Sequence, residues 1–200
     1  MSRSQHPRHV TILLALATAG LFTLTACSGG AIGESTPASN GQNYVSGDSG
    51  VTVFGHGAGP VAPAVTAPAI GGGKLSLSQF RGHVVVMNFW GSWCTPCRSE
   101  APVLSSLAQQ FGRQGVRFLG VDVRDSPVGA EAFMRDHHIS YPSLNDPAGD
   151  VALDFRGTVT PAGIPTTLVI GRNGRITARV VGEVSYSGLR GLIATAVAHA

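Results

Sequence analysis

Two stretches of the chain, residues 84–89 and 116–123, are rich in apolar residues, although the second also contains Arg117 and Asp122. Such runs predict strands that are covered on both faces of a sheet. Each is followed by a segment in which apolar residues recur at helical spacing, residues 96–110 and 127–138. An alternation of strand and helix predicts parallel neighbouring strands joined by right-handed crossovers.

The flanking segments carry shorter patterns. Residues 166–170 and 175–180 predict a strand pair, because the Gly-Arg-Asn-Gly between them suits the positive φ angles of a tight hairpin turn. The fold class is therefore α/β, with a mixed central sheet flanked by helices. Four smaller elements complete the prediction: an N-terminal β-hairpin within residues 62–80, a one-turn helix at 77–80, a short helix at 151–155 in an inserted segment and a closing helix at 186–198.

The N-terminus has the pattern of a targeting segment. Arg3 and Arg8 precede an apolar stretch, residues 10–25, that is short for a membrane span. The sequence Leu-Thr-Ala-Cys that ends at Cys27 resembles a bacterial lipobox. We therefore expect residues 1–26 to be a lipoprotein signal peptide and Cys27 to carry the lipid. The alternative is an ordinary signal peptide with an incidental cysteine, which would leave the protein secreted.

Residues 28–60 are rich in Gly, Ser, Ala and Pro and poor in large apolar side chains. Because such a segment cannot bury a core, we expect residues 27–60 to be the lipidated N-terminus and a flexible tether, with a weak strand pattern near its end. The folded domain is then residues 61–200.

Charge excludes one class of partner. The chain has 14 basic and 11 acidic side chains, a formal net charge of +3. If Arg3 and Arg8 of the predicted signal peptide are left out, the chain has 12 basic and 11 acidic side chains, and its sequence shows no cluster of basic residues. We therefore expect no binding to nucleic acid.

The sequence Cys94-Thr95-Pro96-Cys97 lies between the first apolar strand and its helix. Two intervening residues place the sulfurs about one helical turn apart, so a disulfide can close and reopen with little backbone movement. The helix N-terminus favours a thiolate, the nucleophile of thiol–disulfide exchange. We predict a redox-active Cys94–Cys97 disulfide, in which Cys94 is the exposed attacking thiol and Cys97 resolves the mixed disulfide. Acylation of Cys27 would leave these two thiols to pair.

Two other uses of the cysteine pair fit less well. A zinc site needs four ligands, and the adjacent His137 and His138 suit it poorly. A purely structural disulfide would close a very short loop, where the stabilisation is small. We expect no metal and no cofactor. His56, His83 and Asp122 carry no clear signal, and we interpret them as loop or strand-end residues.

Residues 89–97, Phe-Trp-Gly-Ser-Trp-Cys-Thr-Pro-Cys, resemble the active-site region of the thioredoxin superfamily. The narrower resemblance is to its extracytoplasmic, membrane-anchored TlpA/ResA-like branch, of the cytochrome c biogenesis type. It rests on Glu100 with the following Ala-Pro, on the Gly-Ile-Pro-Thr-Thr of residues 163–167, and on residues 146–150, where that branch carries a helix-containing insertion. Across about residues 62–196, the resemblance implies a thioredoxin-like fold and a thiol–disulfide oxidoreductase.

The resemblance also implies roles inside the site. In ResA-like proteins an acid at the place of Glu100 handles the proton of the second cysteine; the alternative is an exposed acid that stabilises the helix N-terminus. Asn88 stands where ordinary thioredoxins carry a buried Asp, and otherwise would satisfy nearby backbone. The redox potential of the family depends on the dipeptide between the cysteines, here Thr95 and Pro96, and Pro96 stiffens the motif.

The substrate is expected to bind beside the cysteines. The resemblance implies a cis peptide bond before Pro165, which would expose backbone around Ile164 and Thr166 for an extended substrate to pair with as an added strand. A trans-proline turn is the alternative. Trp93 would present an apolar surface to the substrate.

The function expected by family analogy is that of a membrane-tethered monomer that reduces extracytoplasmic protein disulfides. Apocytochrome c before haem attachment is one such substrate, and the electrons would come from a membrane thiol–disulfide carrier. The alternative is an oxidase that installs disulfides in secreted proteins, because the motif does not fix the direction. A peroxidase would need a peroxidatic cysteine with a nearby Thr and Arg. A copper-binding module would need wider cysteine spacing and a well-placed His.

Overall fold

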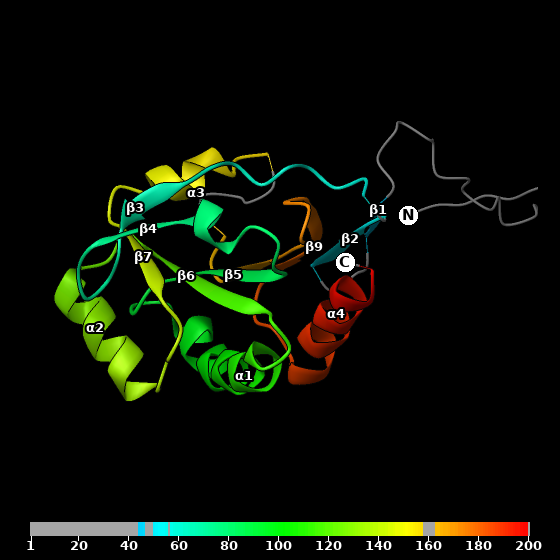
Figure 1. Ribbon diagram of the computed structural model, residues 1–200. Helices are drawn as coiled ribbons and strands as arrows, with labels where there is room; N and C mark the ends of the chain where they lie inside the picture. The colour runs from blue at the N-terminus through cyan, green and yellow to red at the C-terminus, as the bar shows by residue number, and fades with distance from the viewer. Residues whose placement is uncertain (1–43, 47–49, 56, 158–162, 200) are drawn as a thin grey trace, which may run out of the picture. The chain divides into compact units, whose positions relative to one another are not determined.

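The computed structural model describes residues 44–46, 50–55, 57–157 and 163–199 (Figure 1). The predicted signal peptide, Cys27 and His56 lie outside these residues. Within the described part of the chain, none of the helices combines the length and apolar character that crossing a membrane requires.

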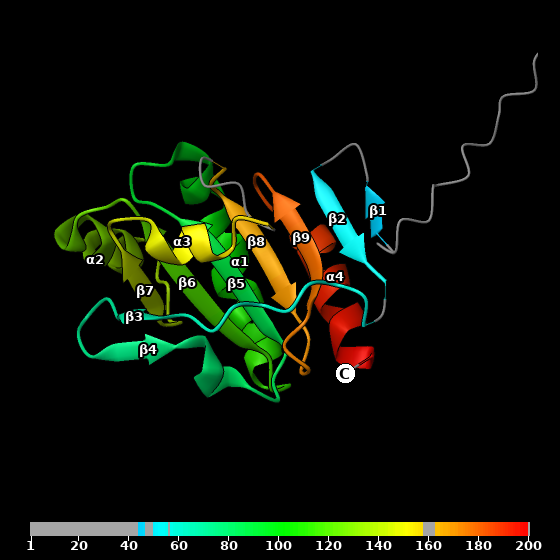
Figure 2. The same cartoon turned by 90° about the horizontal axis from the view of Figure 1, so that it is seen from above.

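A seven-stranded mixed sheet forms the centre of the domain, and Figure 2 shows its strands in the order β1-β2-β9-β8-β5-β6-β7. Strands β5, β6 and β7 are parallel, and the other pairings are antiparallel. A separate hairpin is formed by β3 and β4. The strands are β1 (Tyr44–Ser46), β2 (Val51–Phe54), β3 (Thr66–Pro68), β4 (Lys74–Ser76), β5 (Val85–Trp90), β6 (Arg117–Val123), β7 (Ser143–Asp146), β8 (Thr166–Ile170) and β9 (Ile176–Val181).

Helices cover both faces of the sheet (Figure 1). One face packs against α1 and α4, with α2 beside them, and the other packs against α3, the one-turn η1 and the β3–β4 hairpin. Because side chains alternate along a strand, β5 sends Val86, Asn88 and Trp90 toward α1 and the residues between them toward α3. The helices are α1 (Thr95–Gly112), α2 (Pro127–Asp136), α3 (Asp150–Asp154), α4 (Tyr186–Ala198) and the 3₁₀ helix η1 (Leu77–Phe80).

The predicted fold class is confirmed, and so are the thioredoxin-like architecture, the N-terminal β-hairpin and the helix-containing insertion. All six residues of β5 are buried, as the apolar run predicted. The local rules also hold: Ser126 and Ser185 cap α2 and α4 by accepting backbone N–H bonds, and Pro127 begins α2.

The structure corrects the predicted start of the folded domain. β2 pairs with β9, with Val51 opposite Val180, and β1 pairs with β2, so the sheet takes in residues assigned to the tether before residue 61. β1 is the edge strand of the sheet and β2 lies next to it, with one buried side chain among its four residues. Their weak apolar pattern was therefore not enough to place the boundary.

A second difference is β7, which the sequence did not predict. Its residues Ser-Leu-Asn-Asp show no run of apolar side chains, yet Ser143, Leu144 and Asp146 are buried. β7 pairs with β6, and Ile70 of the segment between β3 and β4 donates its N–H to the Ser143 carbonyl. Neighbours distant in sequence thus make this segment a strand.

Candidate active site

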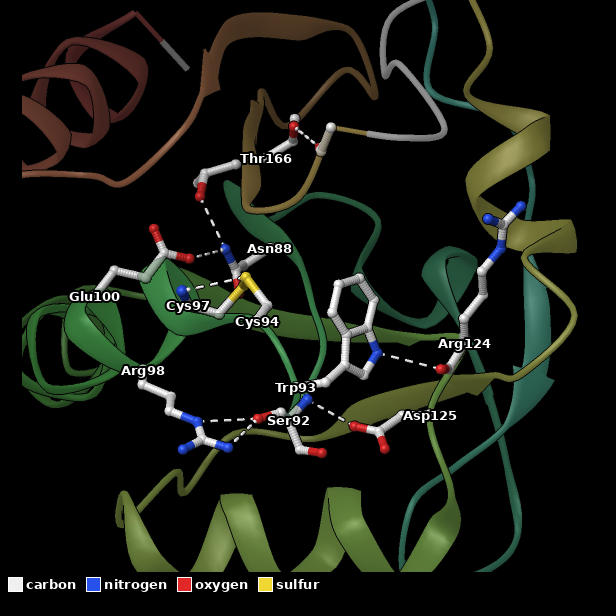
Figure 3. Close-up of a disulfide and its surroundings, with 12 residues drawn as sticks. Asn88, Ser92, Trp93, Cys94, Cys97, Arg98, Glu100, Arg124, Asp125 and Thr166 are labelled. Atoms are coloured by element: carbon white, nitrogen blue, oxygen red, sulfur yellow. Dashed lines mark hydrogen bonds between the residues drawn. A yellow bond between two sulfur atoms is a disulfide. The ribbon is translucent and has the colours of Figure 1, made fainter.

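The cysteine pair lies where β5 leads into α1, and its two sulfurs form a disulfide (Figure 3). Cys94 caps α1, Pro96 is in the first turn and Cys97 follows, with 5.3 Å between the two cysteine Cα atoms. The backbone N–H of Cys97 donates to Cys94 Sγ at 3.3 Å. An N–H of the helix N-terminus is therefore directed at the sulfur expected to become the thiolate.

The prediction that Cys94 is exposed is wrong for this disulfide form. Cys94 is 4% exposed and Cys97 is 1% exposed. Both belong to a small apolar cluster with Trp90, against which Ile70 and Ile164 pack. These two isoleucines come from segments far from the motif in sequence, so local spacing could not reveal the cover.

Glu100 is fully buried, which excludes the exposed-acid interpretation. It lies one helical turn beyond Cys97 on the buried face of α1. The Asn88 amide donates to Glu100 Oε1 at 2.7 Å, and the backbone N–H of Val184 donates to Oε2 at 3.1 Å. Burial raises the pKa of the Glu100 carboxyl from 4.5 to about 7, although the two hydrogen bonds oppose the shift. The group can thus gain or lose a proton near neutral pH.

Asn88 connects three elements at the base of the site. Its amide nitrogen donates both to Glu100 on α1 and to the hydroxyl of Thr167 on β8, at 3.1 Å. The interpretation that the Asn88 side chain bonds to nearby backbone is therefore wrong for its amide nitrogen, which donates to two side chains. Figure 3 shows Asn88 directed from β5 toward Glu100.

The peptide bond between Ile164 and Pro165 is cis, as predicted. Ile164 is half-buried and contacts the cysteine cluster, whereas Thr166 is fully buried. Thr166 lies in β8 between β5 and β9, and its hydroxyl donates to the Gly163 carbonyl. The structure therefore leaves Ile164, and not the Thr166 side chain, near the surface where a substrate could contact it.

The two tryptophans differ sharply. Trp90 is 1% exposed and stacks on Phe133, with 4.5 Å between ring centroids. Trp93 is 56% exposed, as expected for a residue that meets a substrate, and its Nε1–H donates to the Arg124 carbonyl at 3.2 Å. Gly91 permits this arrangement, because an added Cβ would lie 2.8 Å from Trp93 Nε1. Thr95 and Pro96 are both exposed at the start of α1.

Sequence reasoning missed a group of acids near the segment that leads into Cys94. Asp122, interpreted as a strand-end residue without a signal, is fully buried in β6 opposite Trp90 of β5. Burial and the neighbouring Asp125 and Asp146 raise its pKa from 3.8 to about 8. The available signal was an acid inside an apolar strand that neighbours the strand carrying the cysteine motif.

The arrangement suits dithiol–disulfide chemistry. A disulfide lies at a helix N-terminus, and a buried acid that titrates near neutrality lies one turn from its second cysteine. Across residues 44–46, 50–55, 57–157 and 163–199, no three His, Cys, Asp or Glu side chains gather in a way that could hold a metal ion.

Comparison with known proteins agrees with this chemistry. Residues 58–179 match the AhpC/TSA family. Thiol-disulfide oxidoreductase ResA of Bacillus subtilis (strain 168) is 31% identical over 129 residues, which are 64% of this chain and 70% of that relative. A DsbF homologue from Corynebacterium diphtheriae matches with a TM-score of 0.69 and 29% identity, over 76% of this chain and 96% of the other.

A secreted thiol-disulfide isomerase from Corynebacterium glutamicum also matches, with a TM-score of 0.66 and 27% identity, over 82% of this chain and 95% of the other. The matched regions contain both the cysteine motif and the strands that position it. The chain therefore belongs to the AhpC/TSA family, and it is a thiol–disulfide oxidoreductase of the ResA type with a thioredoxin-like fold.

Proposed function

We propose that the protein is a membrane-tethered reductant of extracytoplasmic protein disulfides, with Cys94, Cys97 and Glu100 as its catalytic residues. The observation that carries the proposal is the buried Glu100, whose carboxyl titrates near neutral pH one turn from Cys97. Apocytochrome c before haem attachment is the substrate we propose, since its haem-binding thiols must be reduced. A membrane thiol–disulfide carrier would return the protein to the dithiol form.

The reaction proceeds in two exchanges. The Cys94 thiolate attacks one sulfur of the substrate disulfide, the substrate S–S bond breaks, and the other substrate sulfur leaves as a thiolate. The Glu100 carboxylate then takes the proton of Cys97, whose thiolate attacks Cys94 Sγ. The mixed disulfide breaks, the second substrate thiol is released, and the Cys94–Cys97 disulfide forms. The substrate gains the two electrons that the protein loses.

Two residues support the proposal of a substrate site beside the disulfide. Trp93 is exposed beside the disulfide, and Ile164 is half-buried in the cis-proline loop that covers it. An extended segment that displaces this apolar cover would reach Cys94 Sγ. We propose that Trp93 and Ile164 supply the contacts and that backbone pairing supplies the orientation.

We propose the reducing direction by analogy with the ResA-like branch, because the hydrogen bond from the Cys97 N–H to Cys94 Sγ does not by itself fix the reduction potential. Strong oxidants of this type depend on extra stabilisation of the reduced form. The test is the equilibrium reduction potential of the pair, by titration against thiol buffers. A value near that of thioredoxin, about −270 mV, supports the reductant; one near about −120 mV makes the protein an oxidant.

Trapping of the substrate tests the roles of the two cysteines. Cys97→Ser should accumulate a mixed disulfide between Cys94 and the physiological substrate, because the second exchange is blocked. Cys94→Ser should form no such adduct and have no turnover. Full turnover by Cys97→Ser would overturn the two-thiol mechanism.

The proposal of a membrane tether rests on the sequence of the predicted signal peptide, residues 1–26. We propose that the chain is cleaved before Cys27 and that the Cys27 thiol is acylated. The sheet begins at Tyr44, so the proposed tether spans about residues 27–43. Labelling of cells with a radioactive fatty acid should mark the wild-type protein and leave Cys27→Ala unlabelled. An unlabelled wild-type protein recovered from the medium would favour the secreted form.

A further inference from the structure

The segment that leads into Cys94 is held by the loop between β6 and α2. Asp125 Oδ2 accepts the backbone N–H of Ser92 at 2.6 Å, and the Arg124 carbonyl accepts the indole N–H of Trp93. From the other side, the Arg98 guanidinium donates two hydrogen bonds to the Ser92 carbonyl, at 3.0 and 2.7 Å (Figure 3). The position of the exposed Trp93 ring therefore depends on Asp125 and its loop.

Asp125 is itself a well-satisfied carboxylate. Its Oδ1 accepts the backbone N–H of Ser126 at 2.7 Å, in addition to the bond from Ser92 to Oδ2. Burial acts to raise the pKa of Asp125, but hydrogen bonds from Ser92, Ser126 and Asp122 outweigh it and lower the pKa. Asp125 therefore stays ionised when it holds Ser92.

Asp122 has the opposite environment. It is fully buried, and in the part of the chain that the structure describes neither of its carboxyl oxygens accepts a hydrogen bond. A buried carboxylate without donors is costly, whereas a protonated carboxylic acid can satisfy itself by donating. The neighbouring acceptor is the carboxylate of Asp125.

The groups around Asp122 explain why it keeps its proton. Asp122 points to the face of β6 that carries Phe118, toward α1 and α2, and its partners across the sheet are Trp90 and Asn145, neither of which titrates. The charged groups that act on it are Asp125 and Asp146, both acids. On α1, Arg98 is exposed and bonded to the Ser92 carbonyl, and Glu100 accepts from Asn88 and Val184. The charged residues of α2, namely Glu131, Arg135 and Asp136, are exposed to solvent.

We propose that protonated Asp122 is a positioning residue for the thiol–disulfide reaction: its carboxylic acid donates to Asp125, which holds Ser92 and so fixes the exposed Trp93 beside the disulfide. The inference rests on the proposed function only in assigning Trp93 to the substrate. Ionisation of Asp122 places two carboxylates in contact, so Asp125 turns away from Ser92 and Trp93 loosens. Substrate binding therefore weakens in alkaline solution.

The experiment measures collisional quenching of tryptophan fluorescence by acrylamide, on the oxidised full chain in detergent, from pH 6 to 9.5. The protein has two tryptophans, and Trp90 is buried, so quenching reports Trp93. The wild type should show one increase in quenching centred between pH 7 and 9. Asp122→Asn keeps an N–H donor toward Asp125 but cannot ionise, so its quenching should stay at the low-pH value throughout.

Two further variants make the test specific. Glu100→Gln removes another fully buried acid and should keep the wild-type transition. Asp125→Ala removes the oxygen that accepts the Ser92 N–H and should show high quenching already at pH 6. With a disulfide peptide as substrate, the KM of the wild type should rise several-fold more from pH 7 to 9 than that of Asp122→Asn.

A wild-type protein without the transition, or an Asp122→Asn variant that retains it, would overturn the proposal. If Asp122→Asn does not fold, unchanged low quenching in Asp125→Ala at pH 6 would overturn it as well. The quenching is measured on the disulfide form without substrate. The quenching result therefore does not depend on whether Cys97→Ser traps a substrate. Failure of the proposed role of Asp122 can thus be distinguished from failure of the proposed function.

Discussion

Two fully buried carboxyl groups lie between the sheet and its helices, and they are solvated in opposite ways. Glu100 accepts N–H bonds from Asn88 and Val184, whereas Asp122 receives no such donor among the described residues and faces Asp125. Burial raises the pKa of both groups, to about 7 for Glu100 and about 8 for Asp122. The difference teaches that hydrogen-bond donors allow a buried acid to ionise near neutral pH. A neighbouring acid instead keeps a buried carboxyl group protonated.

The largest effect that separates the two acids is on the exchange rate. Glu100→Gln removes the proton acceptor beside Cys97, and general acid–base groups contribute about 10²–10⁴-fold to a rate. We expect the second exchange to slow on the order of 10²-fold at neutral pH and its pH dependence near pH 7 to disappear. Stopped-flow tryptophan fluorescence, recorded after the reduced protein is mixed with a disulfide substrate, measures the rate of the second exchange. The exposed acid Glu131 supplies the control, since Glu131→Gln should match the wild type.

The next effect is on stability. Both acids have a folded pKa above the unfolded value, so the folded state binds more protons, and the free energy of unfolding falls as pH rises from about 4 to about 8. A shift of this size corresponds to about 3 kcal/mol for Glu100. Urea unfolding of the oxidised protein at pH 5 and pH 8 measures the fall. Glu100→Gln and Asp122→Asn should each lose part of it, and an unchanged fall in both would contradict the assignment.

A smaller effect comes from the donor that serves Glu100. Asn88→Leu removes a hydrogen bond to a charged acceptor, worth about 1.5–3 kcal/mol, and should raise the pKa of Glu100 by about one to two units. The carboxyl carbon resonance of Glu100, titrated by NMR in the oxidised protein, reports the pKa. Thr167→Val is the matched control, because it removes the other partner of Asn88 and leaves Glu100 bonded. Equal pKa values in the two variants would show that Asn88 does not support the charged form.

The smallest effect comes from Glu183, an exposed acid whose charge contributes to raising the pKa of Glu100. Glu183→Gln should lower that pKa by a few tenths of a unit, since exposed charges interact weakly in water. Added salt should lower it in the wild type and leave the variant nearly unchanged. A salt effect of the same size in both proteins would assign it to another charge.

The sequence predicts the parts of the site that are encoded locally. The Cys94–Cys97 spacing, the helix that follows it and the position of Glu100 one turn later all depend on neighbours in the chain. The cis bond before Pro165 was predicted only from the family resemblance. The alternation of strands and helices was enough to predict the fold class, and the cysteine motif with the family resemblance was enough to predict the reaction type.

What the sequence did not predict depends on contacts between distant segments. Ile70 and Ile164 cover Cys94 only after the β3–β4 hairpin and the cis-proline loop fold over the motif. β7 and Asp122 are buried because strands from elsewhere lie beside them. A short polar strand and a lone acid in an apolar strand carry no periodicity that would reveal this.

The cover over the oxidised pair has a consequence for selectivity. With Cys94 4% exposed, small thiols in the surroundings meet little of the sulfur they would have to attack. Under the proposed function, a protein partner would instead bind the Trp93 surface and displace the apolar cover in the same event. We therefore expect the disulfide to be insulated from the ambient redox buffer and to exchange electrons with the partners that recognise its surface.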